Sequence, residues 1–85
     1  MSAGDREERL RRASEAHARS QAAHELARST HRRAAELHHQ AARFQEEHAA
    51  AERELGHADK AEKMEAAARR ARDRARAEHL RAELL

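Results

Sequence analysis

Apolar residues recur along this chain at alternating steps of three and four positions, the spacing typical of a helical coiled coil. In the first part of the chain these steps form a seam of Ala13, Ala16, Ser20, Ala23, Ala27, Thr30, Ala34, Leu37, Ala41, Phe44, His48, Ala51 and Leu55. A second run repeats the spacing with Ala61, Met64, Ala68, Ala71, Ala75, Glu78, Ala82 and Leu85. The pattern therefore predicts two amphipathic helices.

A single glycine separates the two runs. Gly56 follows Leu55, and glycine suits the left-handed residue that ends a helix. Asp59, with Glu62 three residues later, resembles an N-cap followed by a carboxylate at the third helical position. We therefore expect a hairpin. The alternative is one continuous helix, in which Gly56 would cost about 1 kcal/mol relative to alanine.

The predicted organisation is a single all-α domain, a long antiparallel helical hairpin. We expect a disordered N-terminus at 1–4, a first helix over 5–55, a turn at 56–59 and a second helix over 60–85. At 1.5 Å per residue the helices would span ~75 Å and ~39 Å, so the second covers only half of the first. The seam from 13 to 27 then lacks a partner, which favours a dimer or a higher helical bundle.

Composition supports self-association, because the chain has few residues with which to build a core. Of 85 residues 23 are alanine, and only seven Leu, two Met and Phe44 are larger apolar residues. Ten such residues cannot fill a globule of this size, where about 60% of the unfolded surface must be buried. Disorder is disfavoured because the net charge is only +2 and strong helix formers dominate.

Several classes of protein are disfavoured. The absence of cysteine removes disulfides, thiolate metal sites and thiol nucleophiles. The first eight residues contain no apolar run, which argues against a signal peptide, and no stretch approaches the ~20 apolar residues of a membrane span. No phosphate-binding glycine loop or activated nucleophile is visible. We expect a cytoplasmic protein that is not an enzyme and does not bind membranes.

Four of the eight histidines form a column at seven-residue steps: His17, His24, His31 and His38. The heptad places this column immediately beside the predicted seam. In the first interpretation, the imidazoles simply pack over the seam. In the second, they bind a transition metal such as zinc, nickel or copper. In the third, they act as a pH switch, because histidine titrates near pH ~6.5.

Helix geometry restricts the metal interpretation. Seven residues rise ~10.5 Å along a helix, whereas zinc–nitrogen bonds are ~2.0–2.1 Å long. No two histidines of the column can therefore bind one ion within a single straight helix. A second helix would have to supply the other ligands.

The most basic stretch lies in the second helix and contains Arg69, Arg70, Arg72, Arg74 and Arg76. On a helix these side chains divide between the two flanks of the seam, and no aromatic residue lies among them for base stacking. A solvated helix face is the favoured interpretation. Binding to nucleic acid, if it occurred, would be sequence-independent and would weaken steeply with salt.

Three functions remain, in order of preference. The first is a non-enzymatic, self-assembling or adaptor protein that acts through coiled-coil surfaces, with a second copy or another helical protein as partner. The alternative is a histidine-mediated bundle that binds or senses a transition metal. The third is an arginine-based, nonspecific binder of nucleic acid.

Overall fold

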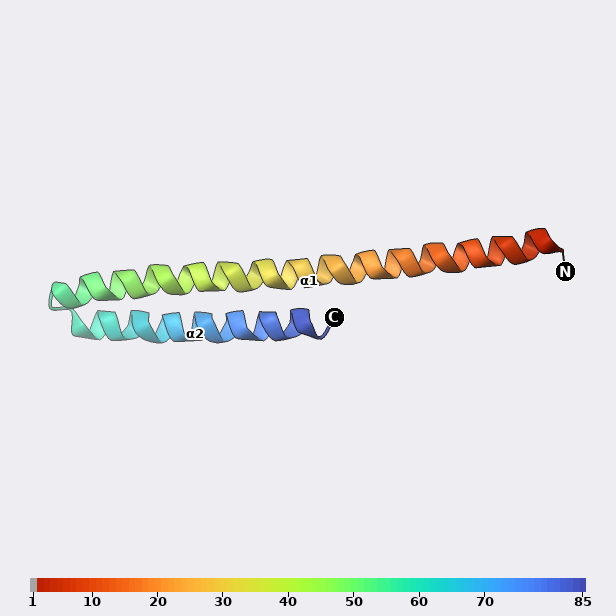
Figure 1. Cartoon of the computed structure of the whole chain (residues 1–85). Coiled ribbons are helices and arrows are strands. Elements are labelled where there is room, and N and C mark those ends of the chain that lie inside the picture. The colour runs from red at the N-terminus through yellow and green to blue at the C-terminus, as the bar shows by residue number, and fades with distance from the viewer. Residues whose placement is uncertain (1) are drawn as a thin grey trace.

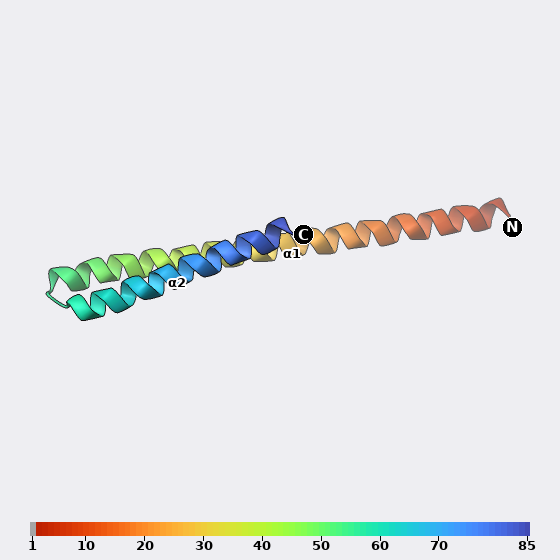
Figure 2. The ribbon, with the colours of Figure 1, turned by 90° about the horizontal axis from the view of Figure 1, so that it is seen from below.

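The computed structural model describes residues 2–85 and shows two helices packed antiparallel as an extended hairpin (Figure 1). Helix α1 spans Ala3–Glu54 and helix α2 spans Ala58–Glu83. The molecule measures 82 × 15 × 11 Å. Figure 2 shows α2 beside only the C-terminal half of α1. The all-α hairpin and its unequal arms are thus confirmed, whereas association of several chains stays a prediction.

Both ends of α1 follow from local chemistry. The helix begins at Ala3, two residues earlier than expected, and the Ser2 hydroxyl accepts a hydrogen bond from the Asp5 amide at 3.4 Å. At the other end Gly56 has φ +80°, the left-handed conformation predicted for it. The His57 amide donates to the Glu52 carbonyl at 2.8 Å, which satisfies one of the last carbonyls of α1.

The predicted cap of α2 is wrong. Its N-cap is His57, which makes no side-chain capping bond, and Asp59 lies inside the first turn. There the negative charge favours the positive end of the helix dipole, but the side chain caps no backbone amide. The turn is shorter than predicted because α2 begins at Ala58, directly after His57.

Alanines fill the interface between the helices. Ala35, Ala42 and Ala49 of α1 are at most 1% exposed, and they lie seven residues apart. On α2 the buried residues are Ala61, Ala68, Ala71, Ala75 and Ala82. Alanine at every seventh position lets two helices approach closely, because interaxial distance depends on the side chains at the contact. Within residues 2–85, no larger apolar side chain is buried.

The interface of α1 is therefore shifted by one residue from the predicted seam. The half-buried side chains His31, His38, Gln45 and Glu52 alternate with the buried alanines along α1. We call these seven positions, from His31 to Glu52, the inner seam. The predicted seam placed Leu37 and Phe44 inside, but they are 56% and 65% exposed. The predicted seam of α2, by contrast, is confirmed at its five buried alanines.

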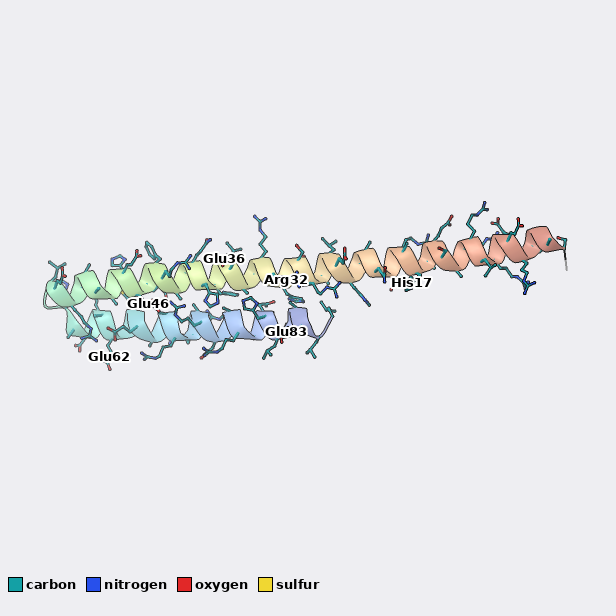
Figure 3. The ribbon with its side chains drawn as sticks, in the orientation of Figure 1. His17, Arg32, Glu36, Glu46, Glu62 and Glu83 are labelled. Atoms are coloured by element: carbon teal, nitrogen blue, oxygen red, sulfur yellow. The ribbon has the colours of Figure 1, made fainter. Side chains whose placement is uncertain are left out.

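A row of charged pairs along one edge of the hairpin fixes the register. Arg53 donates to both carboxylate oxygens of Glu65 at 2.7 and 3.0 Å, and Arg72 does the same to Glu46 at 2.8 and 2.9 Å. In Figure 3, Glu46 lies on the side of α1 that faces α2. The two pairs are seven residues apart on both helices and have opposite polarity. A slip of one heptad would therefore place like charges together.

The N-terminal half of α1 has no partner within the hairpin. Near its boundary the Arg28 guanidinium donates to the Leu85 carbonyl at 3.3 Å, where α2 ends. We call residues 3–27 the overhang. Within the overhang Glu8 pairs with Arg12 at 3.1 Å, four residues away on the same helix. The overhang relies on such pairs and on helix propensity.

Candidate functional site

The most distinctive surface of the molecule is a line of large apolar side chains on α1. Leu26, Leu37, Phe44 and Leu55 are 69%, 56%, 65% and 68% exposed. We call these four residues the outer stripe. Single exposed leucines are ordinary, but aligned apolar residues on a monomer mark an interaction surface.

Helix geometry aligns these four residues. They follow one another at intervals of 11, 7 and 11 residues. At 100° per residue these intervals differ from whole turns by only about 20°, so the side chains share one narrow band. This band lies about 120° around α1 from the inner seam. Helix α2 therefore leaves the outer stripe uncovered.

Small side chains separate the outer stripe from the inner seam. Ala34 is half-buried and Ala41 exposed, and both occupy positions of the predicted seam. Phe44 contacts the ring of His48 edge-on, with ring centroids 5.7 Å apart. The predicted seam thus exists as a pattern, but in the hairpin it faces outward.

The histidine column is divided between two environments. His31 and His38 belong to the inner seam and are half-buried, whereas His17 and His24 are exposed on the overhang. Figure 3 shows His17 beyond the end of α2. The column was expected beside the seam, but it occupies one of the two seam positions itself.

His31 is the member of the column with a polar partner on α2. Its Nδ1 lies 2.5 Å from a carboxylate oxygen of Glu78, whose side chain is 16% exposed. This hydrogen bond is the main cause that holds the pKa of Glu78 below its ordinary value, and the charges of Arg81 and His31 act in the same direction. Removal from water opposes the shift. The interface therefore contains a histidine–carboxylate pair.

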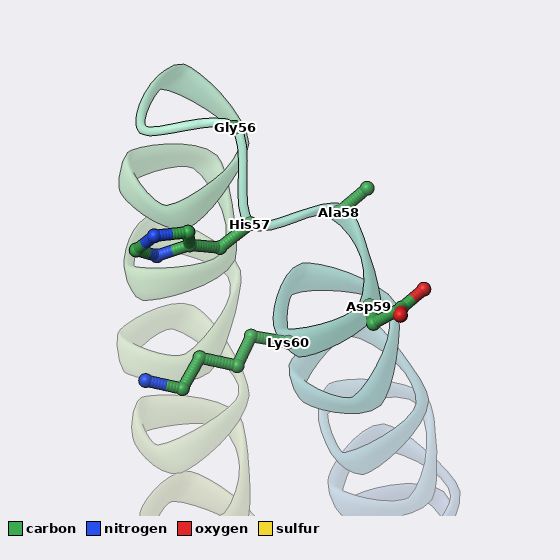
Figure 4. Close-up of a pocket in the computed structure, with 5 residues that line it drawn as sticks. All are labelled: Gly56, His57, Ala58, Asp59 and Lys60. Carbon is green, nitrogen blue, oxygen red and sulfur yellow. The ribbon is translucent and has the colours of Figure 1, made fainter.

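A similar pair closes the turn. His57 Nδ1 lies 2.5 Å from a carboxylate oxygen of Glu52, and this bond is the main cause that lowers the pKa of Glu52. Gly56, His57, Ala58, Asp59 and Lys60 line an open depression of about 420 Å³ at this end of the hairpin. Figure 4 shows His57 and Lys60 directed toward α1, and Asp59 directed away from it. The depression is wide open to solvent, whereas ligand pockets enclose most of the ligand's surface.

The described part of the chain, residues 2–85, contains no cluster of three or more His, Cys, Asp or Glu side chains that could hold a metal ion. His39 and His79 approach across the hairpin with ring centroids 6.1 Å apart, but the Arg72 guanidinium lies 3.3 Å from His39 Nδ1. A cation in that position disfavours a metal ion. The metal hypothesis for His17, His24, His31 and His38 stays a prediction.

The arginines of α2 do not form one basic surface. Arg72 is engaged by Glu46, and Arg76 pairs with Asp73 on its own helix. Arg69, Arg70 and Arg74 are exposed. The described structure therefore divides these residues between ion pairs and solvent, and the nucleic-acid hypothesis stays a prediction.

Among residues 2–85, neither helix has an apolar stretch that could cross a membrane. No family model, curated protein or solved structure matches this chain.

Proposed function

We propose that this protein is a non-enzymatic helical assembly protein, which binds another helix along the outer stripe of α1. The observation that carries the proposal is the contrast between buried and exposed apolar residues. Within residues 2–85 only alanines are buried, while the larger side chains of the outer stripe are exposed. Covering a leucine or a phenylalanine contributes about 1.5–3 kcal/mol, more than covering an alanine methyl group.

Three further features support an assembly role. Leu37, Phe44 and Leu55 of the exposed stripe belong to a three–four repeat, which is the form in which one helix presents a surface to another. The depression at the turn is too open to enclose a small molecule. The overhang extends the α1 surface beyond the part that α2 covers, so a partner helix has a long rod to contact.

The experiment is a measurement of molar mass by sedimentation equilibrium, from low micromolar to high micromolar concentration. The wild type is expected to exceed the monomer mass of 9.7 kDa. The double variant Leu37→Gln/Phe44→Gln should sediment as a monomer, because it places two polar groups in the contact. The matched control Leu80→Gln/Leu84→Gln removes two exposed leucines from α2 and should behave as the wild type.

Two results would contradict the proposal. One is a wild type that stays at 9.7 kDa over the whole range. The other is an outer-stripe variant that associates as strongly as the wild type. As a control, circular dichroism is measured for each variant to check that its helices are intact.

A further inference from the structure

The four residues of the outer stripe are spaced symmetrically along α1. If the proposed assembly function holds, this spacing bears on which helix binds the stripe. Its intervals of 11, 7 and 11 residues are the same in both chain directions. Leu26 and Leu55 lie equally far from the midpoint between Gln40 and Ala41, and so do Leu37 and Phe44. From this geometry we infer that the outer stripe binds the same stripe of a second copy, with the two α1 helices antiparallel.

A two-fold axis explains why such a symmetric surface suits self-association. In a closed dimer the same patch is used twice, so residue i of one copy meets residue j of the other, and j meets i. Here Leu26 meets Leu55 of the second copy, and Leu37 meets Phe44 of the second copy. Each large side chain then has an apolar partner, and both ends of the stripe are covered.

The charges beside the stripe favour the same orientation. Arg33, Gln40 and Glu47 follow at seven-residue steps along one edge of the stripe, and all three are exposed. The antiparallel arrangement places Arg33 within one residue of the level of Glu47 of the second copy, about 1.5 Å along the axis, and places the two Gln40 side chains equally close to each other. A parallel pair in register would place Arg33 level with Arg33 and Glu47 level with Glu47, without this compensation.

Helix α2 leaves room for the second copy. It packs on the inner seam, about 120° around α1 from the outer stripe, so the two α2 helices lie outside the pair of α1 helices. Residues 26–55 of both copies lie side by side over about 44 Å. The two overhangs project from opposite ends and give a rod about 110 Å long, compared with 82 Å for the single hairpin.

Single cysteines test this arrangement directly, because the natural sequence contains none. Leu26→Cys and Leu55→Cys are made separately, and sedimentation under reducing conditions first shows that each remains a dimer. On oxidation, neither variant alone should form a covalent dimer, because its two sulfurs lie about 44 Å apart. An equimolar mixture of the two should form it, because residues 26 and 55 of opposite copies are adjacent. A disulfide requires Cα atoms within about 7 Å.

Two controls complete the design. Gln40→Cys, next to the two-fold axis, should cross-link with itself, whereas Ala18→Cys in the overhang should not cross-link in any combination. Small-angle scattering of the wild type should give a maximum dimension near 110 Å. A parallel dimer would stay near the 82 Å of one hairpin.

The outcomes separate this inference from the proposed function. If the chain associates through Leu37 and Phe44, but Leu26→Cys cross-links with itself, the partner is parallel and the inference is wrong. If the mixture of Leu26→Cys and Leu55→Cys gives no covalent dimer although both sediment as dimers, the register is wrong. In both cases the assembly function stands. If the variant Leu37→Gln/Phe44→Gln still associates, the proposed function itself is wrong.

Discussion

Helix α1 carries one heptad repeat through two regions with opposite surroundings, the half that packs on α2 and the overhang. One column of the repeat is shared, since His17 and His24 in the overhang continue as His31 and His38 in the interface. The other column differs. It holds Ala35, Ala42 and Ala49 where α2 packs, whereas the overhang has Glu7, Ser14 and Gln21 in the equivalent positions.

Among the described residues, this second column is alanine only where α2 packs on α1. The histidine column tolerates both environments, because an imidazole has an apolar face and polar edges that accept either water or a carboxylate. The alanine column requires small side chains where α2 packs, since a longer polar side chain in that position would hold the two helices apart.

The largest expected effect comes from enlarging one alanine of the inner seam. Ala42→Leu places three extra carbon atoms at a fully buried position, and overpacking of this kind costs about 1–3 kcal/mol. We expect a clear fall in the free energy of unfolding, measured by chemical denaturation followed by circular dichroism. Ala22→Leu makes the same change in the overhang, at an exposed position, and should leave the stability nearly unchanged. Equal effects at both positions would contradict the close-packed interface.

A smaller effect is expected from two glycine substitutions with opposite signs. Gly56→Ala forces alanine into φ +80° and should destabilise the hairpin by about 1 kcal/mol. Gly4→Ala lies in the first turn of α1, where the nearest atom outside the helix backbone would be 3.8 Å from the new methyl group. It should be neutral or slightly stabilising, because alanine favours helix over glycine by up to about 1 kcal/mol. Thermal melting followed by circular dichroism gives both values. A Gly56→Ala variant as stable as the wild type would show that the turn does not depend on the left-handed residue.

The smallest effect concerns the histidine–carboxylate pair inside the interface. The pKa of Glu78 is lowered from 4.5 in the hairpin, so its ionised form stabilises the folded state above about pH 4.5. That stabilisation is lost as the pH falls through 4.5 toward the lower pKa of the folded chain. Glu78→Gln should therefore be less stable than the wild type at pH 7, and the difference should shrink below pH 4.5. Melting curves from pH 7 to pH 3 measure it, with Glu83→Gln at the exposed end of α2 as control. A difference that stays constant over this range would show that the charge of Glu78 does not stabilise the hairpin.

The secondary structure and the topology follow from the amino-acid sequence. Helix formers at heptad spacing predict helices in any surroundings, and Gly56 is a position where a left-handed residue costs little. Because the two helices differ in length, part of α1 extends beyond α2, whichever face of α1 packs against α2. The seam of α2 was also predictable, because only one of its faces combines alanine with the three–four spacing.

The buried face of α1, by contrast, becomes evident only once the two helices are packed together. Two neighbouring faces carry a three–four repeat, one with leucine and phenylalanine and one with alanine and histidine. Hydrophobicity alone favours burying the larger side chains, so the sequence predicted the seam one residue away from the observed one. The hairpin buries the smaller residues instead, because Ala35, Ala42 and Ala49 match the alanines of α2 and because the pairs Arg53–Glu65 and Glu46–Arg72 align on the adjoining edge. Packing and charge pairing between two helices depend on both surfaces together, and the periodicity of one helix does not contain that information.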